Sequence, residues 1–343
     1  MTSGLPEAPL LEVKDLFVEF HTRDGVARVI NGVSYHVNAG ETLAVLGESG
    51  SGKSVTAQAV MGILDMPPAR IPSGQILYQG RNLLTLSDAE RRDVRGKEIA
   101  MVFQDALSSL NPVFPVGWQI AEPLRLREGL SKSDANERAV ALMDRVRIPG
   151  ARHRVRDYPH QFSGGMRQRV MIAMALALNP KVLIADEPTT ALDVTVQAQI
   201  MDLLTDLRQQ TGMAVILITH DLGVVAGVAD RIAVMYAGRI VEHADVQALY
   251  ARPAHPYTKA LLDSIPREQR RGQELVTIKG LPPNLVRIPP GCPFHPRCPY
   301  TQAVCQTTLP PQVDLGGGRT SACHFAREVL DGRICPRDGQ TPG

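Results

Sequence analysis

The segment Gly47-Glu-Ser-Gly-Ser-Gly-Lys-Ser54 decides the fold of this 343-residue chain. It follows a short apolar stretch of strand-forming residues, 41–46, and precedes a stretch with helical apolar spacing, 54–64. A glycine-rich loop between a strand and a helix binds phosphate through successive backbone N–H groups. In such a loop Lys53 reaches the β- and γ-phosphates and Ser54 binds Mg²⁺. A glycine-rich turn with a chance lysine would not account for the flanking elements, so the segment predicts a nucleoside triphosphate site.

The pattern around this segment predicts the fold class. Residues 10–46 alternate apolar and polar positions, and turn signals bracket short strands in 65–104. Residues 105–175 are mostly helical and form an insertion between two core strands, after which strands and helices alternate through 182–236. We therefore expect an α/β fold with a mostly parallel sheet, helices on both of its faces, and antiparallel strands that lead into it.

The composition changes after residue 245, where prolines cluster and apolar periodicity weakens. All five cysteines lie beyond this point. We therefore expect two domains: a nucleotide-binding domain over 10–245, with a helical subdomain at 105–175, and a small loop-rich, metal-binding extension over 246–343.

Charge and hydropathy exclude several classes of protein. The net charge is +2, and aromatic residues make up 4% of the chain, so neither a basic nucleic-acid surface nor a stacking platform is expected. The N-terminus lacks the order of a signal peptide. No stretch approaches the roughly 20 apolar residues that cross a bilayer. The chain is expected to be soluble or peripheral, on the cytoplasmic side.

Two carboxylates, Asp186 and Glu187, end the apolar stretch that begins at Val182. A carboxylate at a strand end beside a phosphate loop holds Mg²⁺, and the next carboxylate can act as general base toward the attacking water. Two exposed acids that cap a strand are the structural alternative. The position after a phosphate loop favours the catalytic interpretation.

Three further positions fit the same chemistry. Ser163 is a natural helix N-cap, and Gly164-Gly165 leave that helix start open to an anion. Gln104 ends a strand and opens the helical insertion, where its amide can contact the metal or the water. His220 ends the strand 214–219, where it can face the γ-phosphate, although a lone strand-end histidine is more often structural.

Together these motifs resemble the ATP-binding-cassette family over residues 10–245. The resemblance implies a RecA-like core with a parallel sheet, an antiparallel β-subdomain and a helical insertion. The signature segment departs from the family's commonest form at Phe162 and Met166, which leaves the serine and backbone contacts in place. The resemblance implies that Glu187, His220 and Gln104 are catalytic and that Ser54, Gln104 and Asp186 bind Mg²⁺. Phe20 is the expected adenine-stacking residue, with Phe17 and Tyr35 as nearby alternatives. The implied ATP-binding residues are Phe20, Gly47, Glu48, Ser49, Gly50, Ser51, Gly52, Lys53, Ser54, Ser163, Gly164 and Gly165.

A closer similarity is to the ATPase subunits of dipeptide and oligopeptide importers, carried by residues 103–112, 185–194, 255–262, 291–299 and 323–325. It implies an enzyme that couples MgATP hydrolysis at a dimer interface to peptide uptake. The implied partners are two transmembrane permease subunits, an extracytoplasmic substrate-binding protein and a second ATPase, with a heterodimer favoured over a homodimer. The chain would then lie peripherally on the cytoplasmic face of the inner membrane.

Other functions stay open. Importers of this kind also carry nickel complexes or haem. A soluble cassette ATPase acting on nucleic acid or ribosomes is the alternative from another class, but such proteins usually carry two cassettes or basic tails, and no nucleic-acid partner is expected here. A third interpretation treats the cysteine region as a redox sensor.

Four cysteines, Cys292, Cys298, Cys305 and Cys323, form a series with five, six and seventeen residues between consecutive members. Four thiolates are the ligand set of a structural zinc or of an iron–sulfur cluster. The absence of a close pair, together with the importer resemblance, favours a [4Fe–4S] cluster over zinc or a metal-free region. Cys335 competes with Cys323 as fourth ligand. The predicted cofactors are therefore ATP, Mg²⁺ and this cluster.

Overall fold

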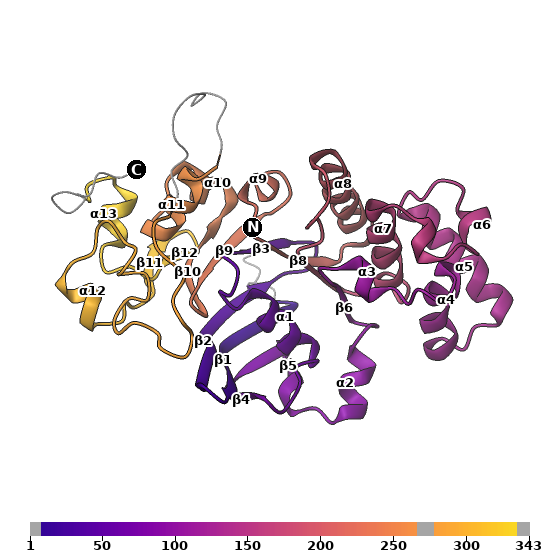
Figure 1. Ribbon diagram of the computed structural model, residues 1–343, viewed down its shortest axis with the longest axis horizontal. Coiled ribbons are helices and arrows are strands. Elements are labelled where there is room, and N and C mark those ends of the chain that lie inside the picture. The colour runs from indigo at the N-terminus through magenta and orange to yellow at the C-terminus, as the bar shows by residue number, and fades with distance from the viewer. Residues whose placement is uncertain (1–7, 266–277, 335–343) are drawn as a thin grey trace, which may run out of the picture. The chain divides into compact units, whose positions relative to one another are not determined.

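The computed structural model describes residues 8–265 and 278–334 (Figure 1). The chain divides into two compact units, which are described separately. The first unit comprises residues 1–36, 42–84 and 219–343, and the second comprises residues 37–41 and 85–218.

The first unit contains the β-subdomain expected from the alternating pattern. Its four-stranded sheet has the order β2-β1-β4-β5, formed by β1 (Leu11–Thr22), β2 (Gly25–Val37), β4 (Ala69–Tyr78) and β5 (Arg81–Asn82), and the short helix η1 (Leu83–Thr85) follows. β1 pairs antiparallel with β4, and β4 with β5. The pairing of β1 is interrupted after Lys14, next to Asp15 with φ 44°. This bulge keeps Leu11, Val13, Leu16 and Val18 all in the core.

A second sheet of this unit carries the phosphate loop. Its strand order is β11-β12-β10-β9-β3, with β3 (Thr42–Leu46), β9 (Arg231–Tyr236), β10 (Arg239–Asp245), β11 (Val313–Gly316) and β12 (Arg319–Ser321). β3 and β9 are parallel, whereas β9, β10, β12 and β11 pair antiparallel. The sheet is therefore mixed: β3 and β9 have the expected parallel pairing, and antiparallel pairing, which was not expected, begins between β9 and β10. The cause is a tight turn after Tyr236, where Ala237 and Gly238 both have positive φ.

The C-terminal residues contribute two strands to this sheet, which their weak periodicity did not predict. Figure 1 shows β11 and β12 beside β10. Arg319 donates to the fully buried carboxylate of Glu242 at 2.8 Å, and that carboxylate also accepts from the backbone N–H groups of Ala254 and His255. A small core of Cys323, Ala326 and Val329 lies beyond β12. The helices of this part of the unit are α9 (Leu222–Val225), α10 (Val246–Ala251), α11 (Pro256–Asp263), α12 (Ala303–Thr307) and α13 (Ala326–Leu330).

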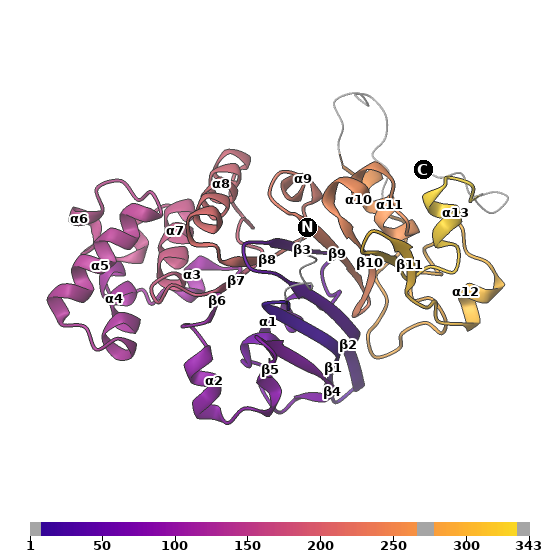
Figure 2. The same cartoon turned by 180° about the vertical axis from the view of Figure 1, so that it is seen from behind.

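The second unit has a parallel sheet with the order β8-β7-β6, formed by β6 (Ile99–Val102), β7 (Val182–Asp186) and β8 (Ala214–Thr219). Between β6 and β7 the chain is helical, as the sequence predicts, and Figure 2 shows α4, α5 and α6 gathered together. The longest helix of this insertion is α5 (Lys132–Arg145), whose first turn is capped by Ser131. The remaining helices are α2 (Asp88–Val94), α3 (Ala106–Ser109), α4 (Val116–Arg127), α6 (Ala151–Arg154), η2 (Pro159–Gln161), α7 (Gly164–Ala175) and α8 (Val194–Thr211).

Candidate functional site

The phosphate loop, residues 47–54, connects β3 to α1 (Lys53–Met61) in the first unit. Gly47 has φ 156°, and a Cβ atom there would lie 2.2 Å from the backbone oxygen of Met235 on β9. This close approach requires glycine. Gly52 is the N-cap of α1, so the helix begins at Lys53. The loop therefore has the backbone path and the helix start that phosphate binding needs.

Two buried polar side chains belong to this loop. Lys53 is 4% exposed, and its Nζ donates to the backbone oxygens of Gly47 at 2.7 Å and Glu48 at 3.0 Å. The Ser51 hydroxyl is buried and has no hydrogen-bond partner among the described residues. An unsatisfied buried hydroxyl is costly, and a phosphate oxygen would satisfy it. Ser54, on the first turn of α1, is half-buried. These residues fit a nucleotide phosphate.

Glu48 is held by the C-terminal region of the same unit. Its carboxylate accepts two hydrogen bonds from Arg297, at 2.6 and 2.9 Å, and its backbone N–H donates to the Tyr257 hydroxyl at 2.9 Å. Burial opposes the charge of Arg297, but hydrogen bonds to Glu48 and Tyr236 outweigh it and raise the pKa of the guanidinium. Sequence alone does not identify Arg297 or Tyr257 as part of the site. They lie more than 200 residues from Glu48, and no motif connects them to it.

The two strand-end carboxylates lie in the second unit, at the end of β7. Asp186 is 5% exposed, and Glu187 is half-buried with a left-handed φ of 45°. Glu187 Oε2 accepts from Gln104 Nε2 at 2.9 Å and from the Thr190 hydroxyl at 3.0 Å. Its backbone N–H donates to the oxygen of Ile218 on β8. The structure thus brings together Gln104 and Glu187, which the sequence predicted as catalytic. Sequence alone did not identify Thr190.

Ser163 is the N-cap of α7, as predicted, and its hydroxyl accepts from the backbone N–H of Met166. Gly165 allows a close approach between α7 and α8, because a Cβ atom there would lie 2.5 Å from Val196. Phe162 is buried beneath the guanidinium of Arg154, which lies 4.2 Å from its ring centroid. The exposed residues of the segment are Ser163 and Gly164. The start of α7 is therefore open to an anion, in agreement with the sequence pattern.

His220 and Phe20 belong to the first unit. His220 is exposed directly after β8, and Phe20 is half-buried near the end of β1, opposite Ala69. Of the alternatives to Phe20, Tyr35 is in the core, and Phe17 packs against Gly32. Phe17 and Tyr35 therefore pack within the protein. Phe20 remains the candidate for stacking on the adenine.

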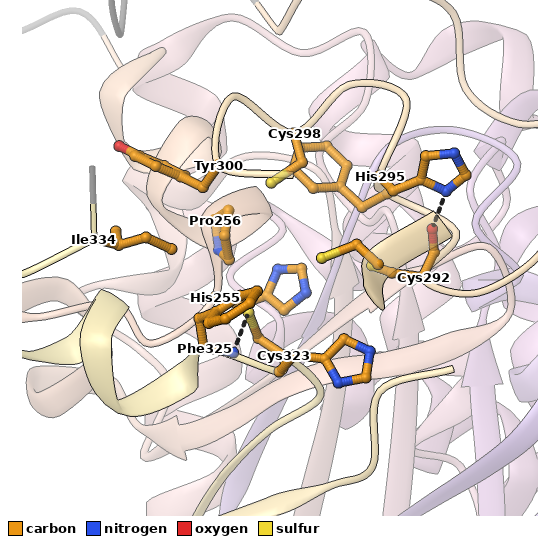
Figure 3. Close-up of a pocket in the computed structure, with 12 residues that line it drawn as sticks. His255, Pro256, Cys292, His295, Cys298, Tyr300, Cys323, Phe325 and Ile334 are labelled. Carbon is orange, nitrogen blue, oxygen red and sulfur yellow. Dashed lines mark hydrogen bonds between the residues drawn. The ribbon is translucent and has the colours of Figure 1, made fainter. Parts of the chain in front are cut away.

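The four predicted cysteine ligands line one pocket of the extension (Figure 3). Burial raises the pKa of the Cys292 thiol to about 11, and those of Cys298 and Cys323 to about 12, with neighbouring thiols adding to each shift. These thiols are protonated at neutral pH, so a metal would have to displace their protons. The other lining residues are largely apolar or aromatic, and they include Phe294, Phe325 and Ile334.

The geometry of this pocket gives the expected metal centre no support. Within the described residues, no group of three or more histidine, cysteine, aspartate or glutamate side chains could hold a metal ion. The space inside the pocket is about 20 Å³, room for about one water molecule. The donor set suits a cluster, but the space does not. Cys335, the competing ligand, lies outside the described residues.

The helices in the described part of the chain are short or carry polar residues on one face or both, when set against a membrane span. None of them is long and apolar enough to cross a bilayer.

Comparison with protein families matches two parts of the chain. Residues 30–190 match the family described as ABC transporter, and residues 241–305 match the one described as oligopeptide/dipeptide transporter, C-terminal region. The phosphate loop, Gln104, Ser163 and the two carboxylates fall within the first match. The series from Cys292 to Cys305 falls within the second.

Similar proteins extend over nearly the whole chain. The oligopeptide transport ATP-binding protein OppD of Salmonella typhimurium is 52% identical, covering 95% of this chain and 96% of its own length. The dipeptide transport ATP-binding protein DppD of Bacillus subtilis is 49% identical, covering 96% and 99%. Among solved structures, cbiO1 of Clostridium perfringens, part of the ABC transporter complex cbiONQ, has a TM-score of 0.62 and 29% identity over 71% of this chain and 92% of its own. The ATP-binding cassette MJ0796, a dimer bound to ADP and phosphate, has a TM-score of 0.62 and 27% identity over 69% and 98%.

Proposed function

Because the chain belongs to the ATP-binding-cassette family of oligopeptide and dipeptide transport proteins, we propose that it is the ATP-hydrolysing subunit of a peptide importer. The observation that carries this proposal is the similarity to OppD, which includes the extension as well as the cassette. The phosphate loop alone would leave many nucleotide-binding functions open. We retain 10–245 and 246–343 as the proposed domains.

In the proposed reaction, Lys53 and Ser51 hold the phosphates. The backbone N–H groups at the start of α1, which form the positive end of the helix dipole, also attract the phosphates. Glu187 accepts the proton of the attacking water, and Gln104 and Thr190 orient its carboxylate through their hydrogen bonds. Ser54, Gln104 and Asp186 would bind Mg²⁺, which offsets the negative charge of the phosphates when present.

The remaining roles depend on a second cassette. We assign His220 to the γ-phosphate of the same site, Phe20 to the adenine, and Ser163, Gly164 and Gly165 to ATP bound by the opposite subunit. The dimer of MJ0796 with ADP and phosphate supports such an interface. The second cassette is proposed to be a related ATPase rather than a second copy.

The proposed importer contains two transmembrane permease subunits and an extracytoplasmic binding protein. This chain would lie on the cytoplasmic face of the inner membrane, where an importer ATPase meets its ATP. The proposed cargo is a di- or oligopeptide, as the names of OppD and DppD indicate for those proteins. A nickel complex or haem is the alternative cargo.

Peptide uptake in cells that lack this chain tests the proposal. We expect uptake of a labelled tripeptide to be lost, restored by the wild-type chain, and not restored by Lys53→Ala. Unchanged peptide uptake with lost nickel or haem uptake would reassign the cargo. Copurification of nucleic acid instead of membrane subunits would favour the alternative class of soluble cassette ATPase.

We also propose that the cysteine pocket accepts a [4Fe–4S] cluster, although its present volume requires the thiols to move apart. The donor set supports this proposal, because four cysteines line the same pocket. Protein purified anaerobically should then contain about four irons per chain and should lose them on single cysteine-to-serine changes. Stoichiometric zinc, or no metal, in iron-replete anaerobic preparations would exclude the cluster.

A further inference from the structure

The C-terminal extension contacts the phosphate loop through an ion pair between Arg297 and Glu48. Arg297 Nη1 donates to Glu48 Oε2 at 2.6 Å, and Nη2 donates to Oε1 at 2.9 Å. The Arg297 side chain is 6% exposed and that of Glu48 25%. A bidentate arginine–carboxylate pair of this kind fixes direction as well as distance. It therefore restrains the loop more firmly than an exposed surface pair would.

The remaining donors of Arg297 are also used. A guanidinium has five N–H groups. Besides Glu48, they reach the backbone oxygens of Lys279 at 3.2 Å and Ile278 at 3.4 Å, and the Tyr236 hydroxyl at 3.4 Å. Tyr236 ends β9, directly after the residue whose backbone oxygen approaches Gly47. The extension and β9 therefore hold the Arg297 guanidinium in position independently of Glu48.

Glu48 is held at every polar group. Its carboxylate meets Arg297, its backbone N–H meets the Tyr257 hydroxyl on α11, and its backbone oxygen accepts from Lys53 Nζ at 3.0 Å and from the Ser51 N–H at 3.2 Å. Any displacement of Glu48 therefore moves an acceptor of the Lys53 ammonium. Glu48 therefore connects the extension to the phosphate-binding Lys53.

We propose that Arg297 and Tyr257 are positioning residues for the nucleotide site, through which the C-terminal extension sets the path of the phosphate loop. The inference rests on the proposed role of residues 47–54 in ATP binding. Neither side chain is among the residues proposed to hold the phosphates. Their loss should weaken ATP binding by displacing Glu48 and Lys53, and it should leave the catalytic carboxylates of the second unit unchanged.

A double-mutant cycle on the full-length chain tests this inference. Binding of a fluorescent ATP analogue with Mg²⁺ is titrated for Arg297→Gln, Glu48→Gln and the double variant. Each single change should lower the affinity about tenfold, and the double variant should be no weaker than the weaker single. Tyr257→Phe keeps the ring and removes only the acceptor of the Glu48 N–H, so an affinity loss of about threefold is expected. Arg287→Gln, an exposed arginine of the same extension, is the matched control and should bind normally.

Two further measurements separate positioning from general stability. In the assembled importer the KM for ATP should rise for Arg297→Gln, whereas kcat stays within about twofold. The thermal midpoint of the nucleotide-free Tyr257→Phe chain should match the wild type, so this variant keeps the test valid even if Arg297→Gln or Glu48→Gln loses stability.

Affinities within twofold of wild type for Glu48→Gln and Tyr257→Phe would overturn the inference, as would additive losses in the cycle. Lys53→Ala is measured alongside. If Lys53→Ala alone loses binding, only the positioning role fails. If Lys53→Ala also binds normally, the proposed ATP site itself is wrong.

Discussion

The phosphate loop and the cysteine pocket are both parts of the first unit, but they are built differently. The loop is eight consecutive residues whose glycines set a local backbone path, and its principal cation bonds to oxygens five and six residues away. The pocket gathers cysteines from 292 to 323 and adds His255 and Pro256 from another segment. A site made from contiguous backbone can be recognised in a sequence. A site made from distant side chains depends on how the intervening chain packs.

Among the substitutions proposed here, Glu187→Gln should have the largest effect, because it removes the proposed base while keeping the size of the side chain. ATP hydrolysis by the assembled importer should fall about 10²- to 10⁴-fold, with MgATP binding retained, because the loop residues are untouched. Steady-state phosphate release and nucleotide titration check both parts. Glu137→Gln, an exposed member of an ion pair with Arg152, is the control. Hydrolysis within a few-fold of wild type would remove Glu187 from the base role.

Lys53→Ala should lower the affinity for MgATP by about 10- to 100-fold, because charge-assisted hydrogen bonds to phosphate are lost. The measurement is equilibrium titration of the full-length chain. Lys132→Ala, at an exposed position of α5, should bind normally. Equal affinity of the Lys53 and Lys132 variants would mean that the loop is not the phosphate site.

Cys323→Ser tests the cysteine pocket instead of the phosphate loop. Cys323 is 8% exposed in the small core with Ala326 and Val329, and a hydroxyl there should cost about 1–3 kcal/mol. Hydrogen exchange of residues 313–334 should therefore accelerate, whereas MgATP affinity should stay within about twofold. Cys335→Ser is the control and should change neither. A loss of ATP affinity comparable to that of Lys53→Ala would show that the two sites are not independent.

The smallest expected effect is on the pH dependence of stability, and it comes from His243 on β10, where the extension joins the cassette sheet. Burial, and next the positive charge of Arg231, lower the pKa of His243 from 6.5 to about 4, and His36 adds to the lowering. The hydrogen bond to the Gly318 oxygen and the charge of Asp245 act in the opposite direction but are weaker. The unfolded chain therefore binds a proton below pH 6.5 that the folded chain does not bind until about pH 4.

It follows that the free energy of unfolding should decrease as pH falls, by at most about 2 kcal/mol between pH 7 and pH 5. Denaturant unfolding at both pH values measures this change. His243→Asn does not titrate in this range, so its dependence on pH should be shallower. An identical slope for the variant and the wild type would contradict the assignment.

Sequence predicted the parts of the fold that local patterns encode. The alternating residues of β1 and the helical insertion between β6 and β7 appear as expected. The antiparallel strands β11 and β12 were not expected, because three or four residues with little alternation carry no signal of their own. They become strands by pairing with β10, which is a tertiary event.

The candidate site divides in the same way. Sequence by itself determined the phosphate loop, the paired carboxylates and the N-cap of α7, because glycine conformation, strand ends and capping depend on a few neighbouring residues. Only the tertiary structure decided that Gln104 bonds to Glu187, that Arg297 and Tyr257 hold Glu48, and that the cysteines enclose a space of about 20 Å³. These contacts join residues separated by up to 249 positions. Their geometry follows from packing and strand pairing, which no local spacing records.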